Sequence, residues 1–528
     1  MRFIYFYSSV CMIIFFSASL NAKEALHELI DRHVEQKAKG LAVAAVADDL
    51  EFLRRASLDF LGRIPTLQEQ KDFLADKSAD KRGAWIDKAL ASKSGAKRLA
   101  DFFHIHFMER LGDNPQWREY LENSFFENKP WNVMASEILK GKRSEEQKSG
   151  AGFFISKRLE NYGQNPVDYS GLARDVGRLF LGKDLRCAEC HDHLFVEEYK
   201  QQDFKGLFAF FENTYLKDAK TMLVAEKLTS KKLEYASVFK KEKKETGPRV
   251  PGLMEVSIPD FPKGQEYLVP PDPKKKFQGV PKFSPLEELS KTLPDSANTS
   301  FSRNMVNRVW FFVMGRGLVH PLDLHHAGNP ASHPELLDML AKVFEAHKYD
   351  VRWLISELAK SKTYQRSSRM DQKLPAKEFF VYGLEKRLSA EQLLASILVA
   401  TGRWNKDKPG EEPSFPEALL QKYMKAFANA AREPEDEIAF SLQAALFLLN
   451  DSTVLKLLEP DEGSLVAQLE KIQDERKAIE LAWLSTLIRK PSEYEVRFAL
   501  EVLKKAKDSK YKVLVWGLLA SSEFNLNH

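Results

Sequence analysis

The 528-residue chain contains only three cysteines, and two of them stand in one short run, Cys187-Ala188-Glu189-Cys190-His191. Because so few thiols cannot cross-link a chain of this length, its fold must depend on a large hydrophobic core rather than on disulfides. The run has the C-x-x-C-H spacing by which haem c is attached to proteins. In that chemistry both thiols add to the haem vinyl groups, and the adjacent imidazole becomes an axial iron ligand. We therefore expect Cys187 and Cys190 to form the thioethers and His191 to be the proximal ligand.

Residues 1–22 have the features of a secretory signal peptide. Arg2 gives a positive start, an apolar run extends to Leu20, and Ala22 offers a small residue for cleavage. The third cysteine, Cys11, lies in this run and would be removed with it. A retained membrane anchor is the alternative, but the run is short and interrupted by serines. We predict a periplasmic or secreted protein with no stable membrane span after cleavage, a location that agrees with haem attachment outside the cytoplasm.

Composition limits the domain number and the kind of partner. Removal of 22 of the 528 residues leaves 506, enough for two or more domains, and the hydrophobic fraction of 44% is ordinary. The 79 basic and 75 acidic residues give a net charge of only +4, which argues against a nucleic-acid-binding surface. The partner that we expect is an unidentified redox protein.

Helical signals dominate the chain, and we predict a mainly α fold with two helical domains. A segment rich in proline and lysine separates them, and its short strand-like stretches, such as 235–239 and 255–258, predict a small irregular β element. Capping boxes that mark helix starts are expected at Thr66/Glu69, Ser332/Glu335, Ser389/Gln392 and Ser492/Glu495. The predicted boundaries are 1–22 for the signal peptide, 23–213 for a cytochrome-like domain with the C-x-x-C-H run, 214–296 for the linker and 297–528 for the C-terminal domain.

Three other interpretations of the C-x-x-C-H run stay open. A zinc site would have to use Cys187, Cys190, His191 and His193, because no second C-x-x-C pair exists, and so short a run would be strained around a tetrahedral ion. A thioredoxin-like pair would need a βαβ setting, whereas the neighbourhood is predicted to be helical. A simple disulfide between the two cysteines is the third.

The second axial position of a haem iron would decide its chemistry. His193 is only two residues from His191 and cannot easily reach the opposite face. His104 lies in an aromatic-rich helical stretch, with Met108 on the same helix face four residues later. His104 is therefore our candidate distal ligand, and a packed side chain is the alternative for both residues.

Other chemistry is less clearly indicated. The sequence has no G-x-S-x-G, H-E-x-x-H or P-loop motif, so it names no catalytic residues. The run 302–319 is rich in polar and aromatic residues that could line a pocket, and we expect an internal structural network instead. Its polar and aromatic members include Asn307, Arg308, Trp310 and Arg316.

The chain resembles exported proteins of planctomycetes and their relatives that carry domains of unknown function 1549 and 1553 in tandem. The first domain is indicated by the run 58–66 and by the block from Phe180 through Cys187-Ala188-Glu189-Cys190-His191-Asp192-His193 to Phe211. The second is indicated by 306–310, 315–319, 332–338, 387–391 and 521–528. Departures from the family pattern occur at Ile105, Leu194, Val196 and Ala395. The resemblance implies a cytochrome-like exported protein and supplies no activity.

The leading hypothesis is an exported c-type haem protein that transfers electrons. One alternative is a haem-dependent oxidoreductase that acts on a small molecule or a saccharide in an interdomain cleft. The other is a non-haem interaction protein with a Cys187–Cys190 disulfide.

Overall fold

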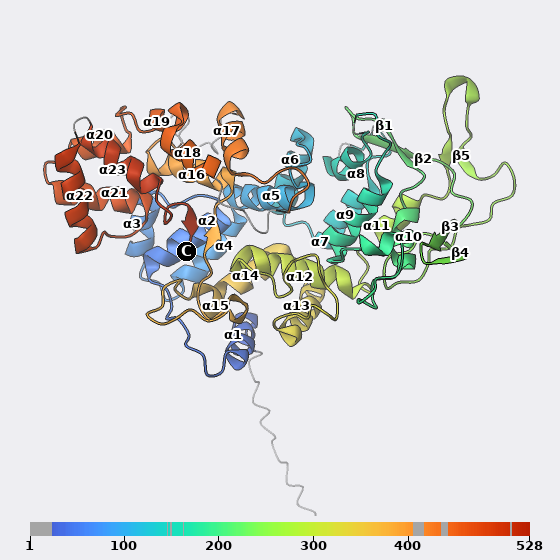
Figure 1. Ribbon diagram of the computed structural model, residues 1–528, viewed down its shortest axis with the longest axis horizontal. Helices are drawn as coiled ribbons and strands as arrows, with labels where there is room; N and C mark the ends of the chain where they lie inside the picture. The colour runs from blue at the N-terminus through green and yellow to red at the C-terminus, as the bar shows by residue number, and fades with distance from the viewer. Residues whose placement is uncertain are drawn as a thin grey trace, which may run out of the picture.

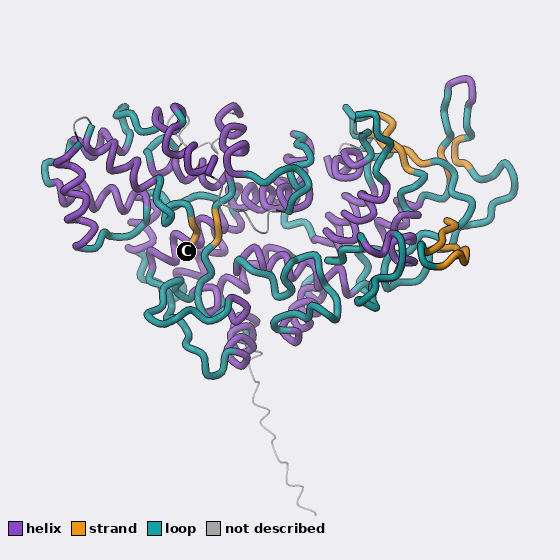
Figure 2. Tube along the Cα trace, in the orientation of Figure 1, coloured by secondary structure: helices purple, strands orange, loops and turns teal. Residues whose placement is uncertain are grey.

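The computed structural model describes residues 24–144, 146–147, 150–161, 163–404, 417–434, 442–506 and 509–528. The expected signal peptide and Cys11 lie outside the described residues. In the described ranges the predicted mainly α fold is confirmed, and strands occur only as small two-stranded sheets (Figure 2). No described helix combines the length and the apolar character that a membrane crossing requires.

The first part of the chain is a series of helices. They are α1 (Leu26–Lys37), α2 (Asp49–Phe60), α3 (Leu67–Ala75), α4 (Lys81–Ala91), α5 (Lys93–Met108), α6 (Pro115–Phe126), α7 (Trp131–Lys140), α8 (Phe153–Arg158), α9 (Tyr169–Leu181) and α10 (Gln201–Ala209), with short 3₁₀ turns η1 (Gly150–Gly152) and η2 (Cys187–Glu189).

Antiparallel hairpins follow in the segment that is rich in proline and lysine. They pair β1 (Thr214–Asp218) with β2 (Leu223–Glu226), β3 (Leu233–Ser237) with β4 (Lys240–Thr246), and β5 (Tyr267–Val269) with β6 (Val280–Pro281) around η3 (Pro273–Lys275). The expected strand at 235–239 corresponds to β3 and the turn after it. The expected strand at 255–258 is absent, since only Glu255 makes an isolated bridge, to Arg249.

Helices form the rest of the chain. They are α11 (Pro285–Thr292), α12 (Thr299–Met314), α13 (Pro334–Ala346), α14 (Val351–Lys360), α15 (Lys362–Gln365), η4 (Lys377–Phe379), α16 (Ala390–Ala400), α17 (Glu417–Phe427), α18 (Leu442–Asn450), α19 (Ser452–Lys456), α20 (Leu465–Glu470), α21 (Glu475–Thr486), α22 (Glu493–Lys505) and α23 (Lys510–Leu519). A last pair joins β7 (Lys386–Arg387) to β8 (Leu526–Asn527) at the C-terminus.

Two hydrophobic cores hold these elements. The larger core runs from α1 to Leu384 and contains the fully buried Trp117, Trp131 and Trp310, so α12 to α14 pack with the helices that precede the hairpins. The smaller core comprises α16 to α23 together with Leu58 and Ile64. In Figure 1 this second group lies at one end of the molecule, and the hairpins lie at the opposite end. The boundary between the two cores therefore does not coincide with the predicted linker at 214–296. The domain boundaries given above remain a prediction.

The buried guanidinium of Arg54 connects the two ends of the chain. It donates hydrogen bonds from α2 to the carbonyl oxygens of Glu523 (3.1 Å), Phe524 (3.2 Å) and Leu526 (2.9 Å). One side chain thus contacts three backbone carbonyl groups near the C-terminus. The C-terminal strand β8 is thereby fixed beside α2.

Three of the four predicted capping boxes form, at Thr66, Ser389 and Ser492. The prediction at Ser332 is wrong because α13 begins at Pro334, which makes His333 the N-cap residue. Ser332 lies one position too early to reach the first helical amides, and its hydroxyl contacts His333 Nδ1 at 3.0 Å instead.

A pH-dependent stability is expected from the ion pair between Arg110, after α5, and Glu391, in α16. Burial raises the pKa of the Glu391 carboxyl, but Arg110 at 2.6 Å outweighs burial and lowers the pKa from 4.5 to about 2. A lowered folded-state pKa stabilises the fold above the unfolded value, and this stability is lost as the pH falls from 4.5 towards 2. Between pH 6 and pH 3, the free energy of unfolding measured in urea should therefore fall by about 2 kcal/mol less in Glu391→Gln than in the wild type.

Glu462→Gln is the matched control, because Glu462 is exposed. It should follow the wild type at both pH values. If the free energy of unfolding fell equally in Glu391→Gln and in the wild type between pH 6 and pH 3, the loss of stability could not come from protonation of Glu391.

Candidate functional site

The C-x-x-C-H run begins just after the end of α9. This helix buries Leu172, Val176 and Phe180 in the larger core, and it ends at Gly182 in the left-handed conformation (φ 68°). A Cβ atom at Gly182 would lie 2.6 Å from His325 Cδ2, so the turn needs glycine both for its φ and for close approach to the 323–326 loop.

The turn after α9 is fixed to that loop by backbone hydrogen bonds. Asp184 N donates to Asp323 O at 2.9 Å, and His325 N donates to Gly182 O at 2.9 Å. On the far side of the run, the Tyr199 hydroxyl donates to His325 O at 3.2 Å. Both ends of the 182–199 segment are therefore attached to the loop that follows α12.

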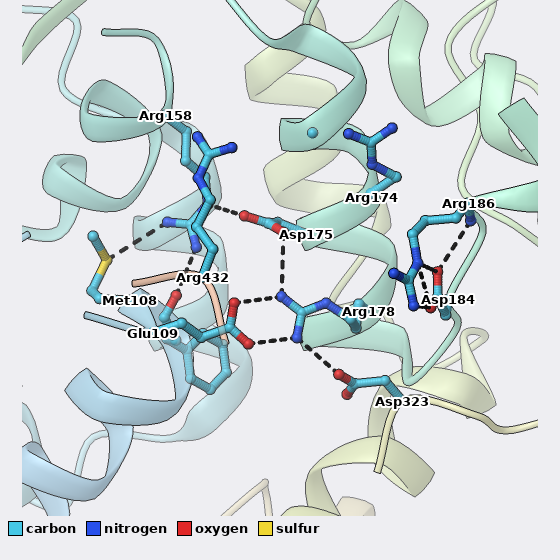
Figure 3. A network of polar contacts seen from close by, with 12 residues as sticks. Met108, Glu109, Arg158, Arg174, Asp175, Arg178, Asp184, Arg186, Asp323 and Arg432 are labelled. Carbon is cyan, nitrogen blue, oxygen red and sulfur yellow. Dashed lines mark hydrogen bonds and ion pairs between the residues drawn. The ribbon is translucent and has the colours of Figure 1, made fainter. Parts of the chain in front are cut away.

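An ionic network centred on Arg178 holds α9 in place (Figure 3). The Arg178 guanidinium contacts the carboxylates of Glu109 (2.6 Å), Asp323 (2.9 Å) and Asp175 (3.3 Å). Burial lowers the pKa of Arg178, but the hydrogen bonds to Glu109 and the charge of Asp323 outweigh burial and raise the pKa well above its usual value. Arg178 thus stays charged, and it joins the end of α5 to α9 and to the loop after α12.

The polar residues of the run 302–319 extend this network. Arg308 pairs with Asp323 and donates to Arg178 O at 3.1 Å, and Asn307 Nδ2 donates to Val319 O at 2.9 Å. The expected internal network is confirmed for these two residues. Arg316, from the same run, instead lines a cavity.

The two thiols of the C-x-x-C-H run are free and exposed. Beside them, His191 Nδ1 lies 2.6 Å from the carbonyl oxygen of Asp192. Because a carbonyl can only accept, Nδ1 carries a proton, and in the neutral imidazole Nε2 then keeps its lone pair. Metal-ligating histidines typically have this arrangement, in which the other ring nitrogen donates to a carbonyl and fixes the tautomer.

The loop around Cys190 is held by its backbone. Cys190 O accepts from Gln201 Nε2 at 2.9 Å and from Val238 N at 3.1 Å, and Asp192 Oδ1 accepts from Gln201 N at 2.8 Å. These bonds tie the loop to the start of α10 and to the turn between β3 and β4. The thiols and the imidazole therefore stand on a supported loop.

His193 has a local structural role. Its Nδ1 accepts hydrogen bonds from the backbone amides of Phe195 (3.1 Å) and Val196 (3.0 Å), so this nitrogen closes a turn. Across the described ranges, no three His, Cys, Asp or Glu side chains gather in a way that could hold a metal ion. The four-ligand zinc set considered from the sequence therefore does not assemble.

Apolar side chains stand exposed around the loop. Leu194, Phe195, Val238 and Phe239 are 67%, 90%, 67% and 68% exposed, and the Phe239 ring centroid lies 4.7 Å from that of His191. Sequence reasoning missed Val238 and Phe239 because it placed them in the linker. The available signal was the apolar pair at the tip of a hairpin that is otherwise rich in lysine and glutamate.

The structure places the candidate distal ligands away from this loop. His104 is 2% exposed, and its Nδ1 accepts a hydrogen bond from Trp117 Nε1 at 3.1 Å. Burial lowers the pKa of His104 to about 3. Met108 is fully buried, with its sulfur 3.6 Å from an Arg158 nitrogen. Both residues pack between α5, α6 and α8, and none of these contacts involves the 187–191 run.

Comparison with known families gave two matches along the chain. Residues 29–215 match the model of PSCyt2, a protein of unknown function (DUF1549), and residues 287–437 match that of PSD1, a protein of unknown function (DUF1553). The two matches stand in the tandem order that the resemblance implied. No curated protein and no solved structure matched it.

The network predicts a measurable dependence of the loop on Arg178. Arg178→Met should lower the free energy of unfolding by about 3 kcal/mol, because Glu109 and Asp323 lose their shared counter-charge. Amide hydrogen exchange should rise across residues 182–199, whose support the network provides. Arg178→Met combined with Glu109→Gln should recover part of the loss, because it removes one stranded charge.

Arg476→Met is the control, because its pair with Glu493 is exposed. It should change stability by less than about 0.5 kcal/mol. Unchanged exchange of residues 182–199 in Arg178→Met would show that the network does not support the loop.

Proposed function

We propose that the protein is an exported c-type haem protein that transfers electrons. The observation that carries the proposal is the geometry at His191: its Nδ1 proton is engaged by Asp192 O, its Nε2 lone pair is left for a metal, and two free thiols stand beside it. Covalent attachment of haem requires accessible thiols, and ligation requires an unprotonated imidazole nitrogen.

The surroundings of the loop suit a large planar group. A haem is mainly apolar and carries two carboxylates, so it needs apolar cover and cationic partners. Leu194, Phe195 and Phe239 offer the apolar cover. Arg174 and Arg186 line a cavity of about 340 Å³ next to the run, where they pair with Glu189 and Asp184, and the haem carboxylates would share these cations. The residues present therefore fit the group.

Each residue of the loop then has a task. Cys187 and Cys190 would hold the haem by thioethers, and His191 would ligate its iron, which supplies reversible one-electron chemistry when bound. Gln201 fixes the position of Cys190 through its carbonyl. Val238, which is 67% exposed beside the loop, leaves an apolar side chain at which a redox partner protein can dock.

A haem-dependent oxidoreductase is the second candidate. The observation in its favour is that His104 and Met108 are both engaged inside the larger core, so neither offers a sixth ligand near the loop. An iron with one open axial position binds small molecules, whereas a six-coordinate iron favours electron transfer. The oxidoreductase candidate predicts that the reduced protein binds carbon monoxide, and the electron-transfer candidate predicts that it does not.

The test is expression of the full chain with its N-terminal segment in a host that has a cytochrome c maturation system. We expect haem that stays with the polypeptide after denaturation, with a mass increase of one haem. Cys187→Ala or Cys190→Ala should leave one thioether and shift the visible band, and the double variant should lose covalent haem. His191→Ala should alter the axial ligation seen by electron paramagnetic resonance.

His193→Ala is the matched control, because His193 Nδ1 is engaged by backbone amides. It should retain covalent haem and the wild-type spectrum. A wild-type protein without haem, made beside a control cytochrome that is loaded in the same cells, would overturn the proposal. A mass lower by two hydrogens would identify the Cys187–Cys190 disulfide instead.

A further inference from the structure

A second site lies on the other side of α5. A cavity of about 450 Å³ opens between α5, the C-terminal end of α12, and the β7–β8 pair. Both matched family segments line it, and so does Asn527 near the C-terminus. Its volume is in the range of sites that take small organic molecules. Nothing in the haem proposal uses this cavity.

The lining of the cavity is strongly cationic. Its basic side chains are Arg98, Arg316, Lys377, Lys386 and Arg387, whereas its only carboxylates are Asp59 and Glu385. Asp59 is already engaged, because it accepts from Asn527 Nδ2 (2.8 Å) and the Tyr364 hydroxyl (2.9 Å) and pairs with Lys386. Asp59 therefore pairs with Lys386, and among the described residues the lining carries more basic side chains than carboxylates.

Two of these cations have no internal partner. The side chains of Arg316 and Lys377 form no hydrogen bond or ion pair with any residue that the structure describes. Arg316 is half-buried where α12 ends, and Lys377 is exposed at the edge of the cavity. A half-buried guanidinium without a counter-charge is costly to keep, and an anion in the cavity would supply that charge.

The remaining wall is aromatic and holds an unsatisfied imidazole. Phe102, Phe311 and Phe312 line the cavity, and the Arg98 guanidinium lies 5.4 Å from the Phe312 ring centroid. His106 Nδ1 donates to Phe102 O at 2.9 Å, so Nε2 is an acceptor. This nitrogen is buried and has no hydrogen-bond partner in the described ranges. Burial also lowers the pKa of His106 to about 3, which keeps the imidazole neutral.

We propose that this cavity binds a small hydroxylated organic anion, with a carboxylate or sulfate group on Arg316 and Lys377. A planar guanidinium binds either anion through two parallel hydrogen bonds. The aromatic wall covers the apolar face of the ligand, and His106 Nε2 accepts from a hydroxyl group after a small shift of the surrounding rings. A sugar acid or a sugar sulfate combines these three properties.

The experiment titrates the full-length protein with three matched probes, D-glucuronate, D-glucose 6-sulfate and neutral D-glucose, in isothermal titration calorimetry. At least one charged sugar should bind saturably, at least ten-fold more tightly than glucose, and more weakly as salt is raised. Arg316→Gln should weaken that binding at least ten-fold, and Lys377→Gln should weaken it less, because Lys377 is more exposed. The preferred probe distinguishes a carboxylate from a sulfate ligand.

Arg476→Gln is the control for loss of a surface arginine, and it should bind as the wild type does. Circular dichroism and the melting temperature of Arg316→Gln show whether the variant is folded. If Arg316→Gln is not folded, the affinity of Lys377→Gln is used for the test. Failure of both charged sugars to bind, binding of glucose with equal affinity, or unchanged affinity in both variants would overturn the proposal. None of these outcomes depends on whether haem is attached at Cys187 and Cys190.

Discussion

The contact between Arg178 and its three carboxylates is the interaction on which the arrangement of the site depends. Glu109 ends α5, Asp175 lies on α9, and Asp323 belongs to the loop after α12. A charge group of this kind is stable only when every member is paired, because a stranded buried charge costs several kcal/mol. The network therefore fixes three segments at once, and the C-x-x-C-H run starts just beyond it. The 1549 and 1553 segments meet here through buried side chains, and the larger core continues across the same boundary.

Much of the fold could be predicted from the sequence because its signals are local. Helical periodicity and the side chains of Thr66, Ser389 and Ser492 determine helix starts within a few residues. The error at Ser332 has a local cause too, since Pro334 moves the first helical position by one residue. The run 187–191 was likewise visible from spacing alone. The tautomer of His191 depends on its contact with the Asp192 carbonyl, and no pattern of residue types encodes that geometry.

The parts that could not be predicted depend on contacts between distant residues. Phe239 lies 48 positions after His191, and only the β3–β4 hairpin brings their rings together. His104 looked like a ligand because it stands among aromatic residues, but the structure shows that Trp117 occupies its Nδ1. The cavity depends most strongly on contacts between residues that are distant in the sequence. Asp59, Arg316 and Asn527 belong to separate motifs, and folding places all three around one space.

The two proposed sites share their supporting helices. On α5, the cavity is lined by Arg98, Phe102, Ile105 and His106, and Glu109 just after the helix binds Arg178. On α12, Arg308 reaches the same network through Asp323, whereas Arg316 just beyond the helix end faces the cavity. An anion that draws Arg316 inward would act on a helix whose other contacts hold the loop after α12. α12 and the turn after it thus carry Arg308 for the network and Arg316 for the cavity. The fold thus provides a physical connection between the cavity and the C-x-x-C-H loop through α12 and its ionic contacts.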